Sequence, residues 1–358
     1  MLSLRFISIS LMFIACSVKS DQSAEAGFTP VVNNEKEVVC FVYHRFGDER
    51  YPSTNIKLVD FEAQLSYLKN NRYTVLSFSD AIDYLRSDSP ATQVAVLTID
   101  DGFNSFYEHA LPLLTKYGFP ATLFINTKTV GGSDYMDWSD LKEAQKQGVE
   151  IGNHTHSHDY FLDLPESERY TTFEKELTLA QNLIQQNTGH TPVTFAYPYG
   201  ELDPKMRDIV EKAGFKAAAA QNSGVIYNGT DLWQCPRFPI SESYASLDEF
   251  TMKARTKALR VTSKTPRSFL LPDGESRPKV ELSFESLGLR LDQLQCFVQG
   301  SKCELTKVTD DHGTVMLSIR SATSIAGRRR TLYTVTVPDD QGQWHWFSHL
   351  WINHEKSN

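Results

Sequence analysis

One stretch decides the fold of this chain: Val94-Ala95-Val96-Leu97-Thr98-Ile99-Asp100-Asp101-Gly102. Its first part is a continuous apolar run bounded by a glycine, which is typical of a strand buried on both faces of a parallel sheet. Asp100 and Asp101 follow at the carboxyl end of that strand. Because barrels of alternating strands and helices build their active sites at this end of their strands, the stretch indicates both a fold class and the place of a site.

A second polar cluster, Asn153-His154-Thr155-His156-Ser157-His158, follows another short apolar strand that is expected at residues 149–151. His154 and His158 are four residues apart, so on a helical turn both imidazoles face the same way and His156 points aside. On an extended strand all three rings share one face. The spacing alone therefore leaves the position of His156 open.

Carboxylates and imidazoles drawn from two strand ends favour a divalent-metal site. One Asp with two His residues leaves a position open for water, which is the pattern of a catalytic metal. Such a water ionises near neutral pH and attacks a carbonyl, while the second Asp takes its proton. Turn-capping aspartates with surface histidines are the alternative, and the two strand ends together disfavour it.

These two stretches, together with Phe195-Ala196-Tyr197-Pro198-Tyr199-Gly200, resemble the three motifs of polysaccharide deacetylases of the NodB-homology type, carbohydrate esterase family 4. The resemblance covers about residues 38–245 and implies a distorted seven-stranded (β/α) barrel. It implies that Asp100 is the general base and that the Tyr199 N–H stabilises the oxyanion. The implied metal ligands are Asp101, His154 and His158.

The chain departs from the family pattern in two places. No histidine lies between His190 and His312, where the family supplies its general acid. Tyr43-His44-Arg45 is similar to the poly-N-acetylglucosamine deacetylase branch, and we expect His44, at a strand end, to protonate the leaving amine; a hydrogen-bonded rim histidine is the alternative. Ala196 stands where the third motif often has an arginine. Arg237 is a candidate to replace it, against the alternative of a surface salt bridge.

Aromatic side chains near the motifs are candidates for stacking on sugar rings: Tyr135, Trp138, Tyr160 and Phe161. Trp138 leads an expected helix, so a place in the core is an equal alternative for it. The most common ion for such a site is Zn²⁺, and Co²⁺, Ni²⁺ and Fe²⁺ also suit one carboxylate and two imidazoles.

Strands alternate with helical stretches along the first two thirds of the chain, as expected for a parallel sheet. The apolar runs predict strands at residues 38–43, 73–76, 94–99, 121–125, 149–151, 193–197 and 215–219. Helical spacing predicts helices at residues 58–68, 107–117, 141–147, 174–186 and 205–212. We place the deacetylase domain at residues 36–257.

The C-terminal part has a different apolar period. Residues 258–278 are rich in Lys, Arg, Ser, Thr and Pro and are expected to be a linker. From residue 279 to 358 the apolar residues alternate, at 280–284, 287–291, 315–319 and 333–337, which favours a small β-sandwich. Trp344, Trp346 and Trp351 are expected in its core, with a sugar platform as the alternative. Arg328-Arg329-Arg330 is expected to be a solvated turn.

The N-terminus resembles an export signal. Arg5 precedes an apolar run at residues 6–15, too short to span a membrane stably, and Cys16 follows it. Residues 1–15 are expected to be a signal peptide, Cys16 a lipid-anchored residue as in bacterial lipoproteins, and residues 16–35 a tether. Simple cleavage and secretion is the alternative. The remaining cysteines are even in number, with Cys296 and Cys303 placed to staple a hairpin and Cys40 and Cys235 bonded or simply buried.

The sequence as a whole therefore predicts a metal-dependent hydrolase that removes N-acetyl groups from an N-acetylglucosamine polysaccharide in the periplasm or cell envelope, anchored to the outer membrane. A net charge of −8 and a pI near 5.7 argue against nucleic acid as a partner. Two alternatives are an O-acetyl esterase acting on xylan or another glycan, and a catalytically degenerate glycan-binding lipoprotein.

Overall fold

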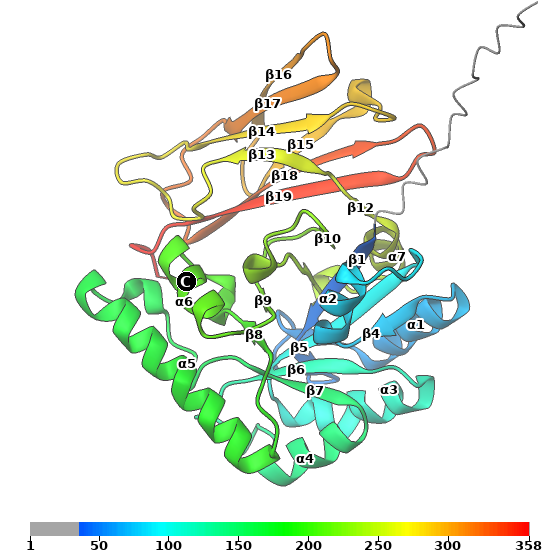
Figure 1. The fold of residues 1–358 in the computed structure, drawn as a ribbon, viewed down its shortest axis with the longest axis vertical. Helices are drawn as coiled ribbons and strands as arrows, with labels where there is room; N and C mark the ends of the chain where they lie inside the picture. The colour runs from blue at the N-terminus through cyan, green and yellow to red at the C-terminus, as the bar shows by residue number, and fades with distance from the viewer. Residues whose placement is uncertain (1–35, 358) are drawn as a thin grey trace, which may run out of the picture. The chain divides into compact units, whose positions relative to one another are not determined.

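The computed structural model describes residues 36–357, in which a curled parallel sheet wrapped by helices is followed by two mainly antiparallel sheets (Figure 1). The signal peptide, Cys16 and the tether lie outside the described residues. Strand β5 (Val94–Asp101) is buried over all but its last residue and lies at the centre of the parallel sheet. It pairs with β1 (Glu37–Tyr43), and along its length with β4 (Thr74–Leu76) and then β6 (Ala121–Ile125).

The sheet continues in parallel order from β6 and then closes on itself. Its next strands are β7 (Val149–Asn153), β8 (Thr194–Ala196) and β9 (Ala217–Ala219). Cys235 forms a parallel bridge with Ala219, and the following β11 (Phe238–Pro239) pairs in parallel with β1. The segment from Cys235 to β11 is thus the seventh barrel strand, and the predicted distorted (β/α) barrel is confirmed. Strand β10 (Val225–Tyr227) adds to β1 in antiparallel fashion.

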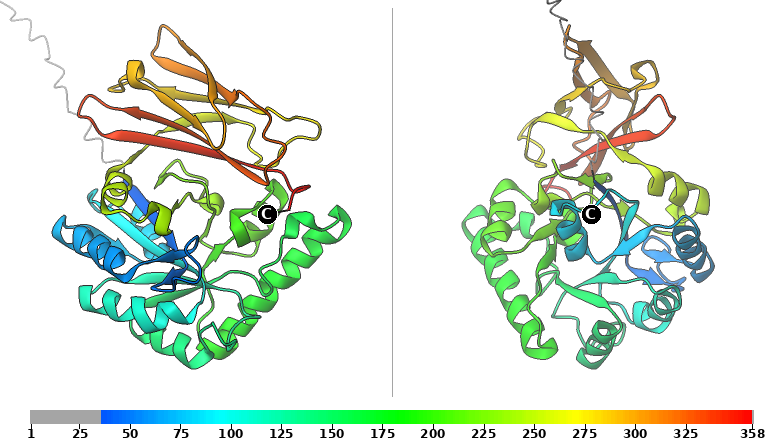
Figure 2. Two further views of the ribbon diagram at one scale, coloured as in Figure 1. Left: turned by 180° about the vertical axis from the view of Figure 1, so that it is seen from behind. Right: turned by 45° about the vertical axis from the view of Figure 1, so that its right-hand side comes forward.

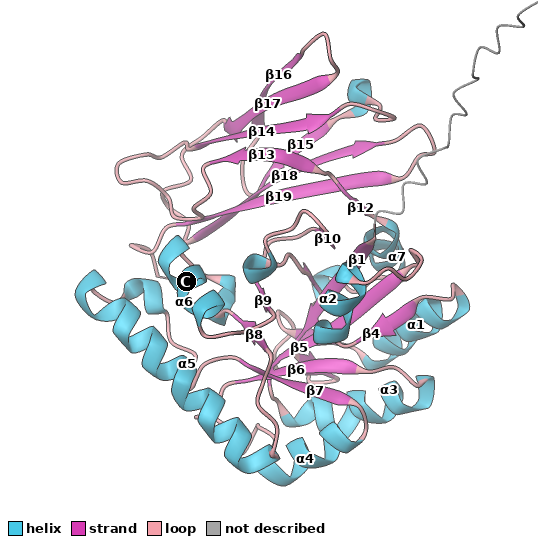
Figure 3. Ribbon diagram, viewed as in Figure 1, coloured by secondary structure: helices cyan, strands magenta, loops and turns pink. Residues whose placement is uncertain are grey.

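Helices cover the outside of this sheet (Figures 2 and 3). They are α1 (Leu58–Asn70), α2 (Phe78–Arg86), α3 (Leu111–Tyr117), α4 (Trp138–Lys146), α5 (Glu166–Thr188), α6 (Pro204–Lys212) and α7 (Leu247–Arg255). Side chains cap several of them: Ser77 accepts from the Asp80 N–H, and Asp137 forms a capping box with Asp140. The apolar spacing predicts five of these helices and misses α2 and α7. The helix expected at residues 107–117 starts as a π-helical turn, Phe106–Ala110, before α3.

The C-terminal part, here called the β-domain, consists of two four-stranded sheets, as the alternating pattern predicts. One has the order β12-β19-β18-β15 and the other β13-β14-β17-β16. Their strands are β12 (Lys257–Ala258), β13 (Val261–Thr265), β14 (Lys279–Glu285), β15 (Gln295–Val298), β16 (Cys303–Thr309), β17 (Thr314–Ser321), β18 (Arg330–Pro338) and β19 (Trp344–Ile352). The alternating residues at 280–284, 315–319 and 333–337 form a core with Trp351.

Three expectations for this part of the chain need correction. The segment 258–278 contains β13, which forms a sheet edge, so it is only partly a linker. The alternation at 287–291 is not a strand, because Leu287 lies in a turn and is 93% exposed. Arg329 is buried rather than solvated, because it pairs with Glu201 of the barrel.

The cysteines divide as the sequence allows. Cys296 and Cys303 form a disulfide between the start of β16 and the neighbouring β15. Cys40 and Cys235 are free and buried in the barrel. Among residues 36–357, none of the helices has the length and apolar character needed to cross a membrane.

Candidate active site

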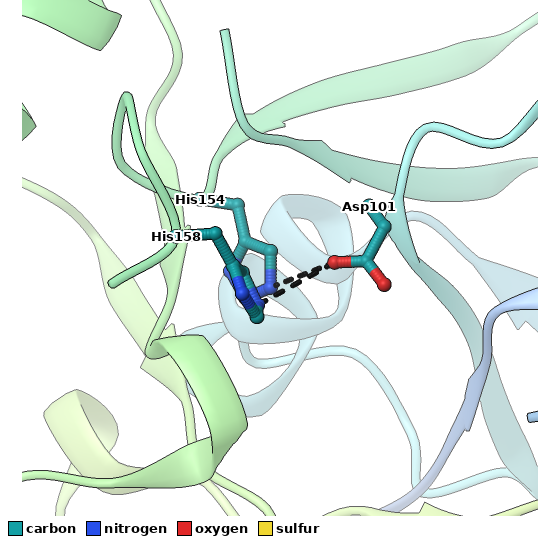
Figure 4. Close-up of side chains that lie close together, drawn as sticks. All are labelled: Asp101, His154 and His158. Carbon is teal, nitrogen blue, oxygen red and sulfur yellow. Dashed lines mark ion pairs between the residues drawn. The ribbon is translucent and has the colours of Figure 1, made fainter. Parts of the chain in front are cut away.

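Three metal-ligating side chains meet at the carboxyl ends of β5 and β7 (Figure 4). The Nε2 atoms of His154 and His158 lie 3.7 and 3.4 Å from Oδ1 of Asp101. One ligand atom from each residue lies within 4.8 Å of the other two. Tetrahedral ligands bonded at about 2.0–2.1 Å are about 3.3 Å apart, so these spacings fit a divalent ion. Among the described residues this is the one group of three such side chains.

The backbone around the ligands is shaped to turn them inward. Five residues other than glycine have positive φ in the described chain, and four of them lie here: Asp101 (78°), Thr155 (66°), His158 (60°) and Tyr199 (59°). Non-glycine residues seldom adopt this conformation, and where they do they cluster at functional sites. The chain therefore leaves regular strand geometry at the points where ligands are needed. The pattern of apolar residues in the sequence does not predict these positive φ angles.

A hydrogen bond holds His154 in the form that binds metal. His154 is 1% exposed, and its Nδ1 lies 2.7 Å from the Ala196 carbonyl, so Nδ1 carries the proton and Nε2 is left as the ligand atom. Burial lowers the pKa of His154 to about 3, so its ring is neutral at pH 7. Burial also lowers the pKa of His158. The loop between them is fixed by the Asn153 side chain, which accepts from the Thr155 N–H at 2.9 Å.

His156 takes no part in the cluster. Its Nδ1 lies 2.8 Å from Oγ1 of Thr127, away from the other two rings. His156 thus points aside, as expected for the first of the two arrangements, but the backbone is an irregular bend with positive φ at Thr155 and His158 rather than a helical turn.

Asp100 is held by a buried arginine. Arg237 is fully buried, and its two terminal nitrogens donate to the two Asp100 oxygens at 2.8 and 2.9 Å. Its position is fixed by two further bonds, to Thr98 Oγ1 and the Ala220 carbonyl. This pair is buried and bidentate, which excludes the surface salt bridge considered for Arg237. The arginine missing at Ala196 is thus replaced from the seventh strand.

The two neighbouring carboxyls differ strongly in acidity. Burial tends to raise the pKa of Asp100, but the Arg237 guanidinium, His154 and His44 outweigh it and lower the pKa to about 2. Burial raises the pKa of Asp101 to about 6, and His44 opposes that rise. Asp100 is therefore ionised at neutral pH. Asp101 is a partly buried carboxyl, with a side chain 17% exposed, and has no ion pair with an arginine among the described residues, as suits a ligand for a cation.

His44 lies at the rim beside these carboxyls. It directly follows β1, is partly buried, and is close enough to Asp100 and Asp101 for its charge to affect both. The structure thus brings His44 to the site where an acid is expected. Its catalytic role stays a prediction.

Tyr199 connects the metal cluster to an aromatic stack. Its ring lies 4.4 Å from that of His158, and the Tyr160 ring stacks on it at 3.7 Å with an interplanar angle of 4°. Gly200 follows with a φ of 69°, and a Cβ there would lie 2.3 Å from the Cβ of Gln221, so only glycine fits. Tyr199 is thus held in its strained conformation directly beside the metal ligands.

The other aromatic candidates have different surroundings. Tyr135 is near the site: it stacks on Phe103 at 4.9 Å, and the Asp101 charge adds to burial in raising its pKa. Trp138 begins α4 and packs against the barrel core, which is the alternative considered for it. Phe161 is 3% exposed and is a core residue, so it is not available to a sugar.

Sequence reasoning missed three residues that shape the site. Asn126, after β6, donates to Asp101 at 3.5 Å. Arg329 of the β-domain places its guanidinium 4.2 Å from the Tyr160 ring and donates to both oxygens of Glu201 at 2.8 and 2.7 Å. Glu201 directly follows the third motif, which was the available signal for it. Arg329 had no local signal, because its partners lie over a hundred residues earlier in the chain.

Comparison with known proteins agrees with this geometry. Residues 87–218 match the family described as polysaccharide deacetylase. Over these residues the chain is similar to polysaccharide deacetylases. The poly-β-1,6-N-acetyl-D-glucosamine N-deacetylase of Staphylococcus aureus (strain MRSA252) is 26% identical to this chain over 212 residues, which are 56% of this chain and 73% of that protein.

Solved structures match about three fifths of the chain. IcaB from Ammonifex degensii is 26% identical with a TM-score of 0.55, over 61% of this chain and 97% of that one. The Streptococcus pyogenes deacetylase PplD, in complex with acetate, has a TM-score of 0.56 at 21% identity, over 62% of this chain and 99% of that one. The second likeness concerns the fold alone.

Proposed function

We propose that this polysaccharide deacetylase hydrolyses the N-acetyl groups of N-acetylglucosamine units in an envelope polysaccharide, with the help of a divalent metal ion. The observation that carries the proposal is the Asp101–His154–His158 cluster next to an Asp100 carboxylate that Arg237 keeps ionised. The substrate class is supported by the name of the staphylococcal relative, a poly-β-1,6-N-acetyl-D-glucosamine N-deacetylase.

Asp101, His154 and His158 would hold the ion, most simply Zn²⁺, with Co²⁺, Ni²⁺ or Fe²⁺ as substitutes. When bound, such an ion would polarise the acetamide carbonyl as a Lewis acid and lower the pKa of a water molecule, so that a weak base such as the Asp100 carboxylate can take its proton. The donor set fits, because the neutral His154 ring presents Nε2 and the Asp101 oxygen lies within 4 Å of both imidazoles.

The residues of the chain then divide the proton transfers. Asp100 accepts the proton of the attacking water, and Arg237 fixes the direction of its two oxygens. The Tyr199 backbone N–H donates to the oxyanion of the tetrahedral intermediate, a type of contact worth about 3 kcal/mol. His44 donates a proton to the departing nitrogen. The C–N bond breaks, and acetate and a free amine leave.

Of the two alternatives, the degenerate glycan-binding protein loses part of its basis. Its basis is the absence of an arginine at position 196 and of a histidine between His190 and His312. Arg237 occupies the first role by contact with Asp100, and His44 lies where the second is needed. The O-acetyl esterase alternative would use the same site residues, so only the substrate distinguishes it from the proposed N-deacetylase.

A panel assay of acetate release tests the proposal. The substrates are β-1,6- and β-1,4-linked N-acetylglucosamine oligomers, peptidoglycan and acetylated xylan, each assayed before and after chelation and with Zn²⁺, Co²⁺ or Ni²⁺ restored. We expect release from the N-acetylated oligomers, its loss on chelation and its recovery with added metal. Release from xylan alone would establish the esterase instead, and glycan binding without release at full metal loading would establish the degenerate protein.

We also propose that the N-terminal segment exports the protein and that Cys16 carries a lipid anchor to the outer membrane. The support is the sequence at residues 1–16 and the Cys296–Cys303 disulfide, which suits an oxidising compartment such as the periplasm. Cell fractionation with a Cys16→Ser variant tests this. The wild type is expected in the membrane fraction and the variant in the soluble exported fraction; a wild type found in the soluble fraction would refute the anchor.

A further inference from the structure

A groove between the barrel and the β-domain begins at the candidate active site. Its volume is about 860 Å³, within the range of ligand-binding pockets. Tyr199 lines it, and the Tyr199 ring lies 4.4 Å from the ring of His158. Phe238 and Pro239, which directly follow Arg237, also line it. The groove therefore borders the site at Tyr199.

Large apolar side chains are exposed along this groove from both domains. Tyr244 and Met252 of the barrel are 50% and 40% exposed, and Phe297 of β15 is 52% exposed. The indole of Trp346 also lines the groove, and its N–H is buried with no acceptor among the described residues. Exposed apolar side chains gathered in one concave surface mark a binding site rather than ordinary surface.

The cations that line the groove are Lys253, Arg328, Arg329 and Arg330, and three of these four lie near carboxylates. Arg329 and Arg330 both contact Glu201, and Arg329 also pairs with Asp163. Lys253 lies four residues after Glu249 on α7, on the same helix face. A polyanion such as nucleic acid is recognised by an excess of cations, which these pairs do not provide. The composition suits an uncharged ligand with apolar faces and polar edges.

We infer that this groove binds uncharged N-acetylated sugar units of the same polysaccharide chain, next to the unit that is being deacetylated. The inference rests on the proposed function. The apolar faces of pyranose rings would pack on Phe297 and Tyr244, while the Gln221 and Gln299 amides face the same groove and offer hydrogen bonds to hydroxyls and acetamides. The family match ends at residue 218, so Phe297 and the β-domain wall lie beyond it.

The test compares substrates of different length. Acetate release is measured on β-1,6-linked N-acetylglucosamine dimer and hexamer with the full chain, with Phe297→Ala and with Tyr244→Ala. We expect the wild-type kcat/KM to be higher on the hexamer than on the dimer. Each substitution should reduce that preference by about 3- to 10-fold, mainly through KM, because one aromatic contact is removed. Val308→Ala is the matched control: Val308 is also 52% exposed but lies on β16, outside the groove, and it should change nothing.

Binding measured separately keeps this result distinct from the proposed function. Isothermal titration with the hexamer should show weaker binding for Phe297→Ala than for wild type and Val308→Ala, even if no acetate is released. Hexamer binding that is equal in all three proteins would overturn the inference. So would a loss on the dimer as large as the loss on the hexamer. Tighter binding of an anionic oligosaccharide than of the hexamer would assign the groove to another ligand.

Discussion

Arg329→Met is expected to destabilise the protein strongly and to disturb the active site. The Arg329 and Glu201 side chains are only 3% and 4% exposed, and two hydrogen bonds join them. Removal of one partner from a buried ion pair typically costs about 3–5 kcal/mol. Arg330 also contacts Glu201, at 3.1 Å, and remains as a counter-ion, so we expect a loss at the lower end of that range. An exposed pair is typically worth less than about 1 kcal/mol. The cost therefore measures how far the β-domain and the barrel depend on each other.

A double-mutant cycle isolates the pair. Arg329→Met, Glu201→Leu and the double variant are unfolded in urea and followed by circular dichroism and by tryptophan fluorescence, because coincident transitions justify a two-state free energy. Each single change should cost several kcal/mol. The double variant should cost less than their sum, with a coupling of about 2–3 kcal/mol. Arg320→Met is the matched control, because Arg320 pairs with Glu304 on the same domain while 50% and 45% exposed.

Arg329→Met is also expected to lower the catalytic rate. The Arg329 guanidinium lies 4.2 Å from the Tyr160 ring, which stacks on Tyr199 at 3.7 Å. Loss of the guanidinium should loosen this stack and lower kcat, by up to about 100-fold if the site shifts by about 1 Å. The reasoning is refuted if Arg329→Met costs no more stability than Arg320→Met, or if the double variant costs the full sum of the singles.

The remaining predictions concern the site itself. Arg237→Ala should lower kcat by about 100-fold with metal content unchanged, because the Asp100 oxygens lose their bidentate partner; elemental analysis and acetate release check this, and unaltered turnover would contradict it. His154→Ala should lose bound metal in the same analysis, whereas His156→Ala, whose ring faces away, should retain it. His44→Ala should lower turnover by about 100- to 10,000-fold with metal bound, and near-wild-type turnover would remove His44 from the mechanism.

Much of the barrel and of the candidate metal cluster can be predicted from local sequence patterns. A buried parallel strand needs continuous apolar residues, so β5 and β6 are visible as apolar runs, and the polar residues that follow β5 and β7 mark the rim. One Asp and two His side chains indicate a divalent-metal site once the fold brings them together. The alternation in β14, β17 and β18 likewise predicts a sheet with one buried face.

Contacts between residues distant in the chain were decided only by tertiary structure. Arg237 reaches Asp100 because the segment from Cys235 to β11 closes the barrel beside β1, and that closure leaves no local period. Arg329 is buried because Glu201 lies opposite it, although a run of three arginines by itself predicts a solvated turn. The apolar period of a strand predicts which of its faces is buried. It does not predict which charged residue of the other domain lies opposite the strand. The residue types of this site could therefore be read from the sequence, while the partners that hold Asp100 and Tyr199 in place required the fold.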